Sequence, residues 1–186
     1  MTELTEEGLL RRVRAGDTEA FGVLVERHMR RAYVHALGIV GSREDARDLS
    51  QEAFARAFGA RHTLDPERPF YAWLYQILRR LCFNFLRDRS TRSRLLEEGA
   101  PDWLVVTDDA QAGHPALDVE RDDLRRRVAM AIEGLPPRDR EVLVLKEFED
   151  LKYREIADLL GVPIGTVMSR LYAARKRLAE AMEMYP

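Results

Sequence analysis

Apolar residues recur at intervals of three and four along most of the chain, which is the spacing of one face of an α-helix. Before position 96 this pattern predicts four helices, at residues 6–15, 18–39, 43–58 and 69–89. After position 118 it predicts four more, at residues 119–133, 138–148, 153–160 and 164–178. No segment alternates apolar and polar residues over enough positions to indicate a β-strand. The pattern therefore predicts an all-α protein.

Glycine and proline residues support the predicted helix ends. Gly16 and Gly161 each follow an apolar stripe, where glycine can adopt the left-handed conformation that ends a helix. Pro136 and Pro137 cannot continue a helix but can start one. The last two predicted helices are separated only by the residues GVP at 161–163, so they are expected to form a helix–turn–helix.

Residues 96–118 separate the two groups of helices and have the composition of a flexible linker, with little periodicity and several glycine, proline and acidic residues. The 186-residue chain has a net charge of −2, but this value hides +4 in residues 1–95, −8 in 96–123 and +2 in 124–186. We therefore expect two small helical domains, 1–95 and 119–186, joined by a flexible acidic linker at 96–118. An apolar patch, WLVV at 103–106, lies within that linker and has no assigned role.

Composition excludes several classes of protein. Cys82 is the one cysteine, so the chain can form neither an internal disulfide nor a cysteine-rich zinc site, and Cys82 is expected to be a small buried hydrophobe. No apolar run approaches the roughly 20 residues of a membrane span, and the N-terminus lacks the features of a signal peptide, so we expect a cytoplasmic protein. His28 and His35 lie seven residues apart, but no third ligand has suitable spacing. We expect no metal, no cofactor and no catalytic residue.

The final predicted helix has the chemistry of a DNA-recognition helix. Its apolar stripe should face the other helices, which leaves small residues near its start and cations farther along on the opposite side. Short side chains permit close approach to bases in a major groove, while arginine and lysine reach phosphates. The candidate contacts are Gly165, Thr166, Ser169, Arg170, Tyr172, Lys176 and Arg177. Periodicity alone leaves a second interpretation open, because helix pairs also serve simply as packing units and cations interact favourably with helix C-termini.

Three longer stretches resemble one protein family. LPPRDREVLVLKEFEDLKYREIADLLGVPIGTVMSRLYAARKRL resembles the fourth conserved region of sigma-70 family RNA polymerase sigma factors. DARDLSQEAFARAF and FYAWLYQILRRLCFNFLRDR are similar to parts of region two. Two regions joined directly by a short linker match the extracytoplasmic-function (ECF) group. The resemblance implies a non-catalytic subunit that binds core RNA polymerase, through the clamp helices of the largest subunit and the flap of the second. It also implies recognition of promoter minus-10 and minus-35 elements, and an anti-sigma partner.

The resemblance also assigns roles to residues in the first domain. It implies that one polar helix face binds polymerase, through Asp48, Gln51, Glu52 and Arg56. It implies that the helix after the loop 62–69 reads the minus-10 element and that the loop holds a flipped-out base. Off the expected apolar stripe of that helix, aromatic rings next to cations could stack on bases and hold the backbone. These residues are Tyr71, Tyr75, Gln76, Arg79, Arg80, Phe83, Asn84 and Arg87. Trp73 lies on the stripe and is expected to be part of the core.

Other classes of protein remain as alternatives. A helix–turn–helix regulator would bind an operator by itself, whereas a sigma factor of this kind needs core polymerase to bind promoters well. The regulator interpretation leaves residues 1–95 unexplained. The sequence contains no phosphate-binding glycine loop and no nucleophile motif, so it gives no support for an enzyme. A pure interaction scaffold would fail to direct promoter-specific transcription.

Overall fold

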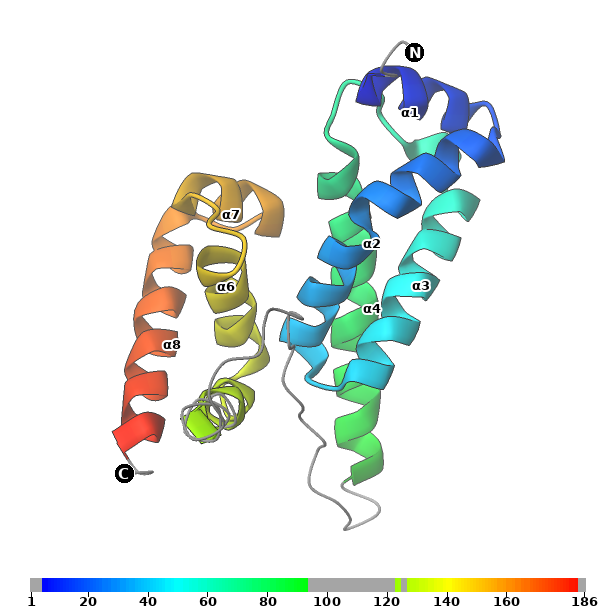
Figure 1. The fold of residues 1–186 in the computed structure, drawn as a ribbon. Coiled ribbons are helices and arrows are strands. Elements are labelled where there is room, and N and C mark those ends of the chain that lie inside the picture. Colours follow the sequence, from blue (N-terminus) through cyan, green and yellow to red (C-terminus); the bar gives the residue numbers. More distant parts are fainter. Residues whose placement is uncertain (1–4, 94–122, 125–126, 184–186) are drawn as a thin grey trace, which may run out of the picture. The chain divides into compact units, whose positions relative to one another are not determined.

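The computed structural model describes residues 5–93, 123–124 and 127–183, which are drawn in colour in Figure 1. These residues form helices and connecting turns without any strand, which confirms the predicted all-α class. The chain divides into two compact units, and the main boundary falls between Gly99 and Ala100. The predicted linker at 96–118, with its apolar patch at 103–106, lies outside the described residues.

The first unit contains the four helices that the apolar pattern predicts before position 96 (Figure 1). They are α1 (Glu6–Arg14), α2 (Thr18–Val40), α3 (Arg43–Gly59) and α4 (Phe70–Ser93), with a short 3-10 helix, η1 (Arg61–Thr63), before α4. Helix α2 packs against both α1 and α4. Because α4 contributes a continuous buried stripe to this packing, its orientation decides which of its side chains remain on the surface.

Polar contacts fix both ends of α1. At its C-terminal end Gly16 has a φ of +99°, as predicted for a left-handed cap. The adjacent Asp17 accepts hydrogen bonds from the Ala20 backbone N–H (3.0 Å) and from Arg12 Nε (2.8 Å). These two bonds lower the pKa of the Asp17 carboxyl. At the other end, Glu6 Oε1 accepts a 2.7 Å hydrogen bond from the Phe70 backbone N–H, so α1 caps the first turn of α4.

The buried face of α4 is rotated from the face that the sequence predicts. Phe70, Leu74 and Leu81 are buried as expected, but Trp73 is only half-buried. Tyr71 and Tyr75 are 4% and 0% exposed, so the prediction that they lie off the packed stripe is wrong. Over residues 70–91, for which burial is described, the buried residues of α4 are Phe70, Tyr71, Leu74, Tyr75, Leu78, Leu81 and Cys82. Cys82 is the small buried hydrophobe expected from its surroundings.

The second unit contains a three-helix arrangement preceded by helical residues 127–133. It consists of α6 (Pro137–Glu147), α7 (Tyr153–Leu160) and α8 (Ile164–Glu183), each of which packs against the other two. Gly161 has a φ of +65° between α7 and α8, which confirms the predicted left-handed end of α7.

The core of the second unit is formed by one stripe from each helix. Val142 and Leu145 of α6, Ile156 and Leu160 of α7, and Val167, Leu171 and Ala174 of α8 are buried. The predicted stripe of α8 is therefore largely confirmed. Two members of the stripe that the sequence predicts are not buried, since Leu178 is half-buried and Ile164, in the first turn of α8, is 48% exposed. The predicted stripe is Ile164, Val167, Leu171, Ala174 and Leu178. Within the described residues, no helix is long and apolar enough to span a membrane.

Candidate nucleic-acid and polymerase interfaces

The outward side of α8 carries four of the residues predicted to contact the minus-35 element. Gly165, Ser169, Tyr172 and Lys176 lie within about 60° of one another around the helix, opposite the buried stripe. All four are exposed, and Tyr172 is 73% exposed. Apart from its own chain neighbours and the adjacent helix backbone, no protein atom lies within 4 Å of the position that a Cβ at Gly165 would occupy. The start of this face is therefore open to a close external partner.

Thr166 and Arg170 lie at one flank of that face and are only half-buried. The Ser169 hydroxyl donates a 3.1 Å hydrogen bond to the Thr166 carbonyl oxygen, which orients the serine along the helix. Arg170 Nη1 is enclosed and has no hydrogen-bond partner. Since a buried unpaired N–H group is unfavourable, this guanidinium gains from any acceptor that reaches it.

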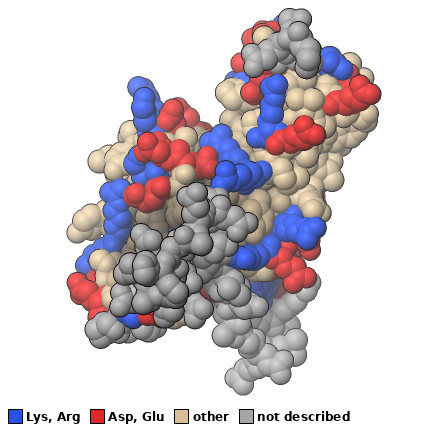
Figure 2. All heavy atoms as spheres, viewed as in Figure 1, with Lys and Arg blue, Asp and Glu red and all other residues tan. Residues whose placement is uncertain are grey.

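The cations at the C-terminal part of α8 differ in their partners. The Lys176 side chain is 64% exposed and lies 3.8 Å from Glu180, which is a loose contact. Arg177 instead forms an ion pair with Asp139 of α6, and Arg175 forms one with Glu147 of α6 at 2.7 Å. Figure 2 shows positive side chains along the edge of the second unit that α8 forms, with negative ones among them. Lys176 is thus the more available cation for a phosphate.

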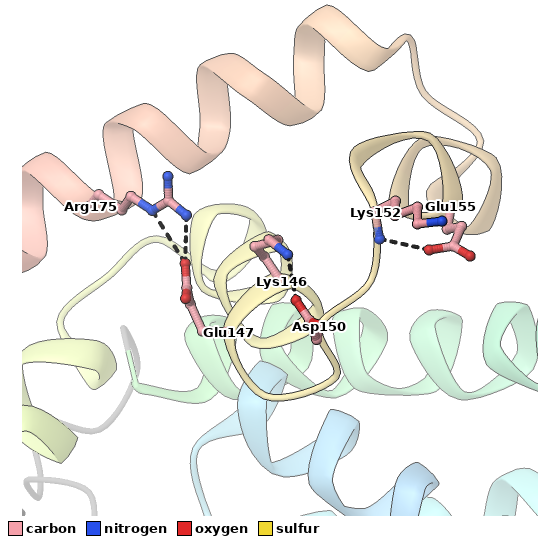
Figure 3. Close-up of polar contacts among 6 residues, drawn as sticks. All are labelled: Lys146, Glu147, Asp150, Lys152, Glu155 and Arg175. Carbon is pink, nitrogen blue, oxygen red and sulfur yellow. Dashed lines mark hydrogen bonds and ion pairs between the residues drawn. The ribbon is translucent and has the colours of Figure 1, made fainter.

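Polar contacts order the turn between α6 and α7. Lys146 Nζ lies 2.7 Å from Asp150, whose φ of +47° is unusual for a residue other than glycine. The Lys152 backbone N–H donates a 2.7 Å hydrogen bond to Glu155 Oε2, which caps α7. Figure 3 shows both contacts together with the pair that joins Arg175 to Glu147. The helix–turn–helix therefore has a defined geometry before any partner binds.

On α4, four of the residues predicted to read the minus-10 element form one exposed face. Gln76, Arg80, Asn84 and Arg87 are spaced four, four and three residues apart, which places them on one side of the helix. Arg87 forms an exposed 3.2 Å pair with Asp88. Beside this face, the Arg79 guanidinium lies 4.8 Å from the centre of the Phe83 ring. A ring next to several cations is suited to a single-stranded base and its phosphates.

Tyr71 and Tyr75 lie on the opposite side, within the core. The Tyr71 hydroxyl and His35 Nδ1 share a 2.6 Å hydrogen bond, and the Arg31 guanidinium lies 4.1 Å from the Tyr71 ring centre. Burial, together with the positive charge of Arg31, lowers the pKa of His35 to about 3. A tyrosine enclosed in this way cannot stack on an external base. These two residues are therefore no longer candidates for base contact.

The loop ahead of α4 has an anchored centre and an open side. Leu64 is buried, and Asp65 Oδ1 accepts a 3.1 Å hydrogen bond from the Glu67 backbone N–H, which folds the loop into a turn. An open pocket of about 350 Å³ lies between this loop and α1. Its lining residues are Arg11, Arg14, Asp65, Pro66 and Glu67.

The residues predicted to bind polymerase share the outward face of α3. Asp48, Gln51, Glu52 and Arg56 are all exposed. Arg56 donates two hydrogen bonds to Glu52 Oε1, of 2.6 Å from Nη2 and 2.9 Å from Nε. This side of the face is ordered, while Asp48 and Gln51 present a carboxylate and an amide to the surroundings.

The apolar pattern missed two exposed residues on α8. Ile164 and Met168 are 48% and 52% exposed, and with Tyr172 they recur at intervals of four residues. Ile164 is apolar and lies on the stripe predicted to face the other helices, so the sequence did not indicate its exposure. Within the described residues, no group of three or more histidine, cysteine or acidic side chains is arranged to hold a metal ion.

Comparisons with known proteins bear on both units. A model of Sigma-70 region 2 matches residues 24–92, and a model of Sigma-70 region 4 matches residues 125–178. The RNA polymerase sigma-H factor of Pseudomonas aeruginosa is 32% identical over 193 residues, covering 98% of this chain and 96% of that protein. The ECF RNA polymerase sigma-E factor of Haemophilus influenzae is 32% identical over 184 residues, covering 97% of each.

Two solved structures have a similar fold. CnrH, in complex with the cytosolic domain of CnrY, is 26% identical with a TM-score of 0.66, covering 97% of this chain and 99% of that chain. The sigma factor RpoE from Bartonella quintana, crystallised with the anti-sigma factor NepR, is 24% identical with a TM-score of 0.66. That match covers 89% of this chain and 98% of RpoE.

Proposed function

The chain belongs to the ECF group of sigma-70 family RNA polymerase sigma factors, and we propose that it divides promoter recognition between its two units. It directs promoter-specific initiation as a subunit of RNA polymerase. In this proposal residues 1–95 bind core polymerase and the minus-10 element, while residues 119–186 read the minus-35 element. The observation that carries the proposal is the exposed face of α8, which begins at an unobstructed glycine on a preformed helix–turn–helix.

At the minus-35 element, α8 enters the major groove with Gly165 and Ser169 nearest the bases. Glycine permits close approach of the backbone, and a serine hydroxyl can donate to or accept from a base edge. Lys176 lies farther along the same side and reaches a phosphate. Thr166, Arg170 and Tyr172 surround these contacts.

At the minus-10 element, the outward face of α4 binds single-stranded DNA. Phe83, supported by Arg79, offers a stacking platform, while Arg80 and Arg87 neutralise phosphates. Gln76 and Asn84 supply amide groups that can hydrogen-bond the Watson–Crick edge of an unstacked base. The loop at 62–69 and the pocket beside it receive the extruded base.

The outward face of α3 binds the clamp helices of the largest polymerase subunit, and the second unit contacts the flap of the second subunit. Both assignments rest on family membership and on the exposure of Asp48, Gln51, Glu52 and Arg56. An anti-sigma factor that covers such surfaces is the expected inhibitor. The protein acts in the cytoplasm, where RNA polymerase works, and carries out no chemistry of its own.

Reconstitution tests this function directly. The purified chain would be mixed with bacterial core RNA polymerase and a template library randomised over the minus-35 and minus-10 segments. The mixture should initiate at defined start sites that share a sequence at both segments, while core enzyme alone should not. Absence of both association and specific initiation would overturn the proposal. If the isolated chain bound a DNA site tightly without polymerase, the alternative of an independent helix–turn–helix regulator would replace it.

A further inference from the structure

Two arginines of α8 reach the same neighbouring helix from opposite sides. Successive residues of an α-helix are rotated by about 100°, so Arg175 and Arg177 point about 160° apart, on either side of the buried stripe. Both nevertheless bind α6. Arg175 contacts Glu147 at the C-terminal end of α6, and Arg177 contacts Asp139 in its first turn. These two carboxylates are separated by eight residues, or about 12 Å along the helix axis.

The two contacts differ in their exposure to water. The Asp139 side chain is only 12% exposed and lies in the first turn of α6, where a negative charge is favourable. Arg177 covers it from outside, with half of its own side chain exposed. In the second contact, Arg175 donates from Nη2 (2.7 Å) and Nε (3.3 Å) to Glu147 Oε1, as Figure 3 shows. Glu147, and after it Tyr153 of α7, raise the pKa of the Arg175 guanidinium.

The positions of the two ion pairs restrict rotation of α8 about its own axis. The buried residues Val167, Leu171 and Ala174 already limit rotation of α8 about its own axis, and a single ion pair would add a restraint on one side only. Two pairs on opposite flanks oppose rotation in both directions, because turning α8 either way lengthens one of them. The rotation of α8 decides which side chains face outward, and the present rotation presents Gly165, Ser169 and Tyr172.

We propose that the pairs Asp139–Arg177 and Glu147–Arg175 set the rotation of α8 and thereby determine which of its side chains meet the bases of the minus-35 element. This inference rests on the proposed function and adds four positioning residues to it. It also reassigns Arg177, which the sequence pattern places among the DNA contacts. The competing interpretation is that both arginines bind phosphates and that the carboxylates hold them only while DNA is absent.

The two interpretations differ in what loss of a carboxylate does. The test uses holoenzyme reconstituted from core RNA polymerase and the full chain, on templates randomised over the minus-35 segment. For Asp139→Asn and for Glu147→Arg, we expect discrimination against single minus-35 substitutions to fall by about tenfold, comparable to the loss of one base contact. If the arginines are phosphate contacts, the same variants leave the base preference unchanged and raise initiation.

The exposed pair between Glu147 and Arg175 allows a charge-reversal rescue. A variant that had merely lost stability would not be rescued in this way. Glu147 and Arg175 are each about half exposed, so reversing both charges, Glu147→Arg with Arg175→Glu, should fold and restore the base preference that Glu147→Arg loses. Thermal unfolding of each variant checks that it is folded. Failure of the double variant to recover the preference, while it remains folded, overturns the proposal.

Lys176→Gln serves as the matched control, because Lys176 lies between the two arginines on the outward side. It should leave the base preference unchanged and reduce the slope of log affinity against log salt by about one, as expected for one lost phosphate contact. Arg177→Gln should change the preference without this reduction in slope; a reduction with unchanged preference would contradict our assignment. Absence of initiation by the wild-type holoenzyme would instead refute the proposed function itself.

Discussion

At the scale of single residues, the contact between His35 and Tyr71 explains why part of the aromatic face of α4 is unavailable to DNA. The tyrosine hydroxyl has a partner inside the unit, so burying its ring leaves that polar group satisfied. The same enclosure keeps His35 neutral. Its ring also lies edge-on to Tyr75, 5.3 Å away between centres. One buried histidine thus orders two tyrosines that the sequence offers as base-stacking residues.

His35 should make the stability of the first unit depend on pH. Its folded pKa of about 3 lies below the reference value of 6.5, so the unfolded chain binds a proton that the folded chain does not. The stability that the neutral His35 ring contributes is complete above pH 6.5, the pKa of the unfolded chain. It is lost as pH falls toward the folded pKa of about 3. Between about pH 7.5 and about pH 5, this group should lower the free energy of unfolding by about 2 kcal/mol.

Urea denaturation at a series of pH values measures this effect. His35→Gln, which has no titrating ring, should be less stable at neutral pH but show a flatter pH profile over that range. His62→Gln, in the exposed η1 turn, is the control and should keep the wild-type profile. An equally steep profile in His35→Gln would show that other groups cause the pH dependence.

Gly165 allows stability to be separated from DNA binding. Because a Cβ there meets no protein atom within 4 Å, Gly165→Ala should stabilise α8 by about 0.5 to 1 kcal/mol through helix propensity. The added methyl should nevertheless lower initiation from minus-35-dependent promoters if the backbone approaches DNA at this point. Gly22→Ala, at an exposed and equally unobstructed position on α2, should stabilise without lowering initiation. Equal activity of the two variants would exclude close approach at Gly165.

At the scale of elements, α3 and α8 illustrate two kinds of exposed face. On α3, Arg56 and Glu52 bind each other, and an exposed pair of this kind contributes little to stability. On α8, by contrast, ion pairs reach across to α6 and connect different helices. A face whose side chains bind one another within one helix is available to a partner without loss of the fold. This distinction makes α3 a suitable docking surface.

Replacing Asp48 and Gln51 of α3 with alanine should weaken binding to core polymerase. Both side chains are exposed, so Asp48→Ala with Gln51→Ala should leave the thermal unfolding temperature nearly unchanged. We expect affinity for core enzyme, measured by competition, to fall about tenfold, which is typical of losing one significant interface contact. Glu19→Ala removes an exposed carboxylate from α2 and is the control. Wild-type affinity in the double variant would place the docking surface elsewhere.

At the scale of the whole molecule, the two units have separate cores, and family models match them separately. Each unit offers a limited set of DNA contacts. When both are connected and held by polymerase, binding of one raises the local concentration of the other near its own element. In the proposed function, selectivity for a promoter is therefore a property of the connected pair.

Separating the units should reveal this coupling. Residues 1–95 and 119–186, supplied as two polypeptides with core polymerase, should initiate at least about 100-fold less than the intact chain at equal concentration. Replacing 96–118 with a Gly/Ser segment of equal length should restore most of the activity, since connection matters more than linker chemistry. Initiation by the separate units at the level of the intact chain would contradict the coupling.

The sequence by itself determined the helical class, most helix boundaries and the family. The class and the boundaries follow from local physics, because apolar periodicity selects α-helix and Gly16 and Gly161 end helices through their backbone freedom. The family was identified from the resemblance of three stretches of sequence. The exposed candidates on α8 follow from the same periodicity, whereas Asp48, Gln51, Glu52 and Arg56 of α3 were assigned through the family resemblance.

Only the tertiary structure decided the rotation of α4 and the partners of the α8 cations. On α4, apolar and aromatic residues occupy adjacent positions, so two overlapping stripes fit the sequence, and packing against His35 on α2 selects the one that buries Tyr71 and Tyr75. On α8, neighbouring arginines have similar chemistry. Their ion pairs depend on Asp139 and Glu147, 38 and 28 residues away in the chain, which periodicity cannot associate with them.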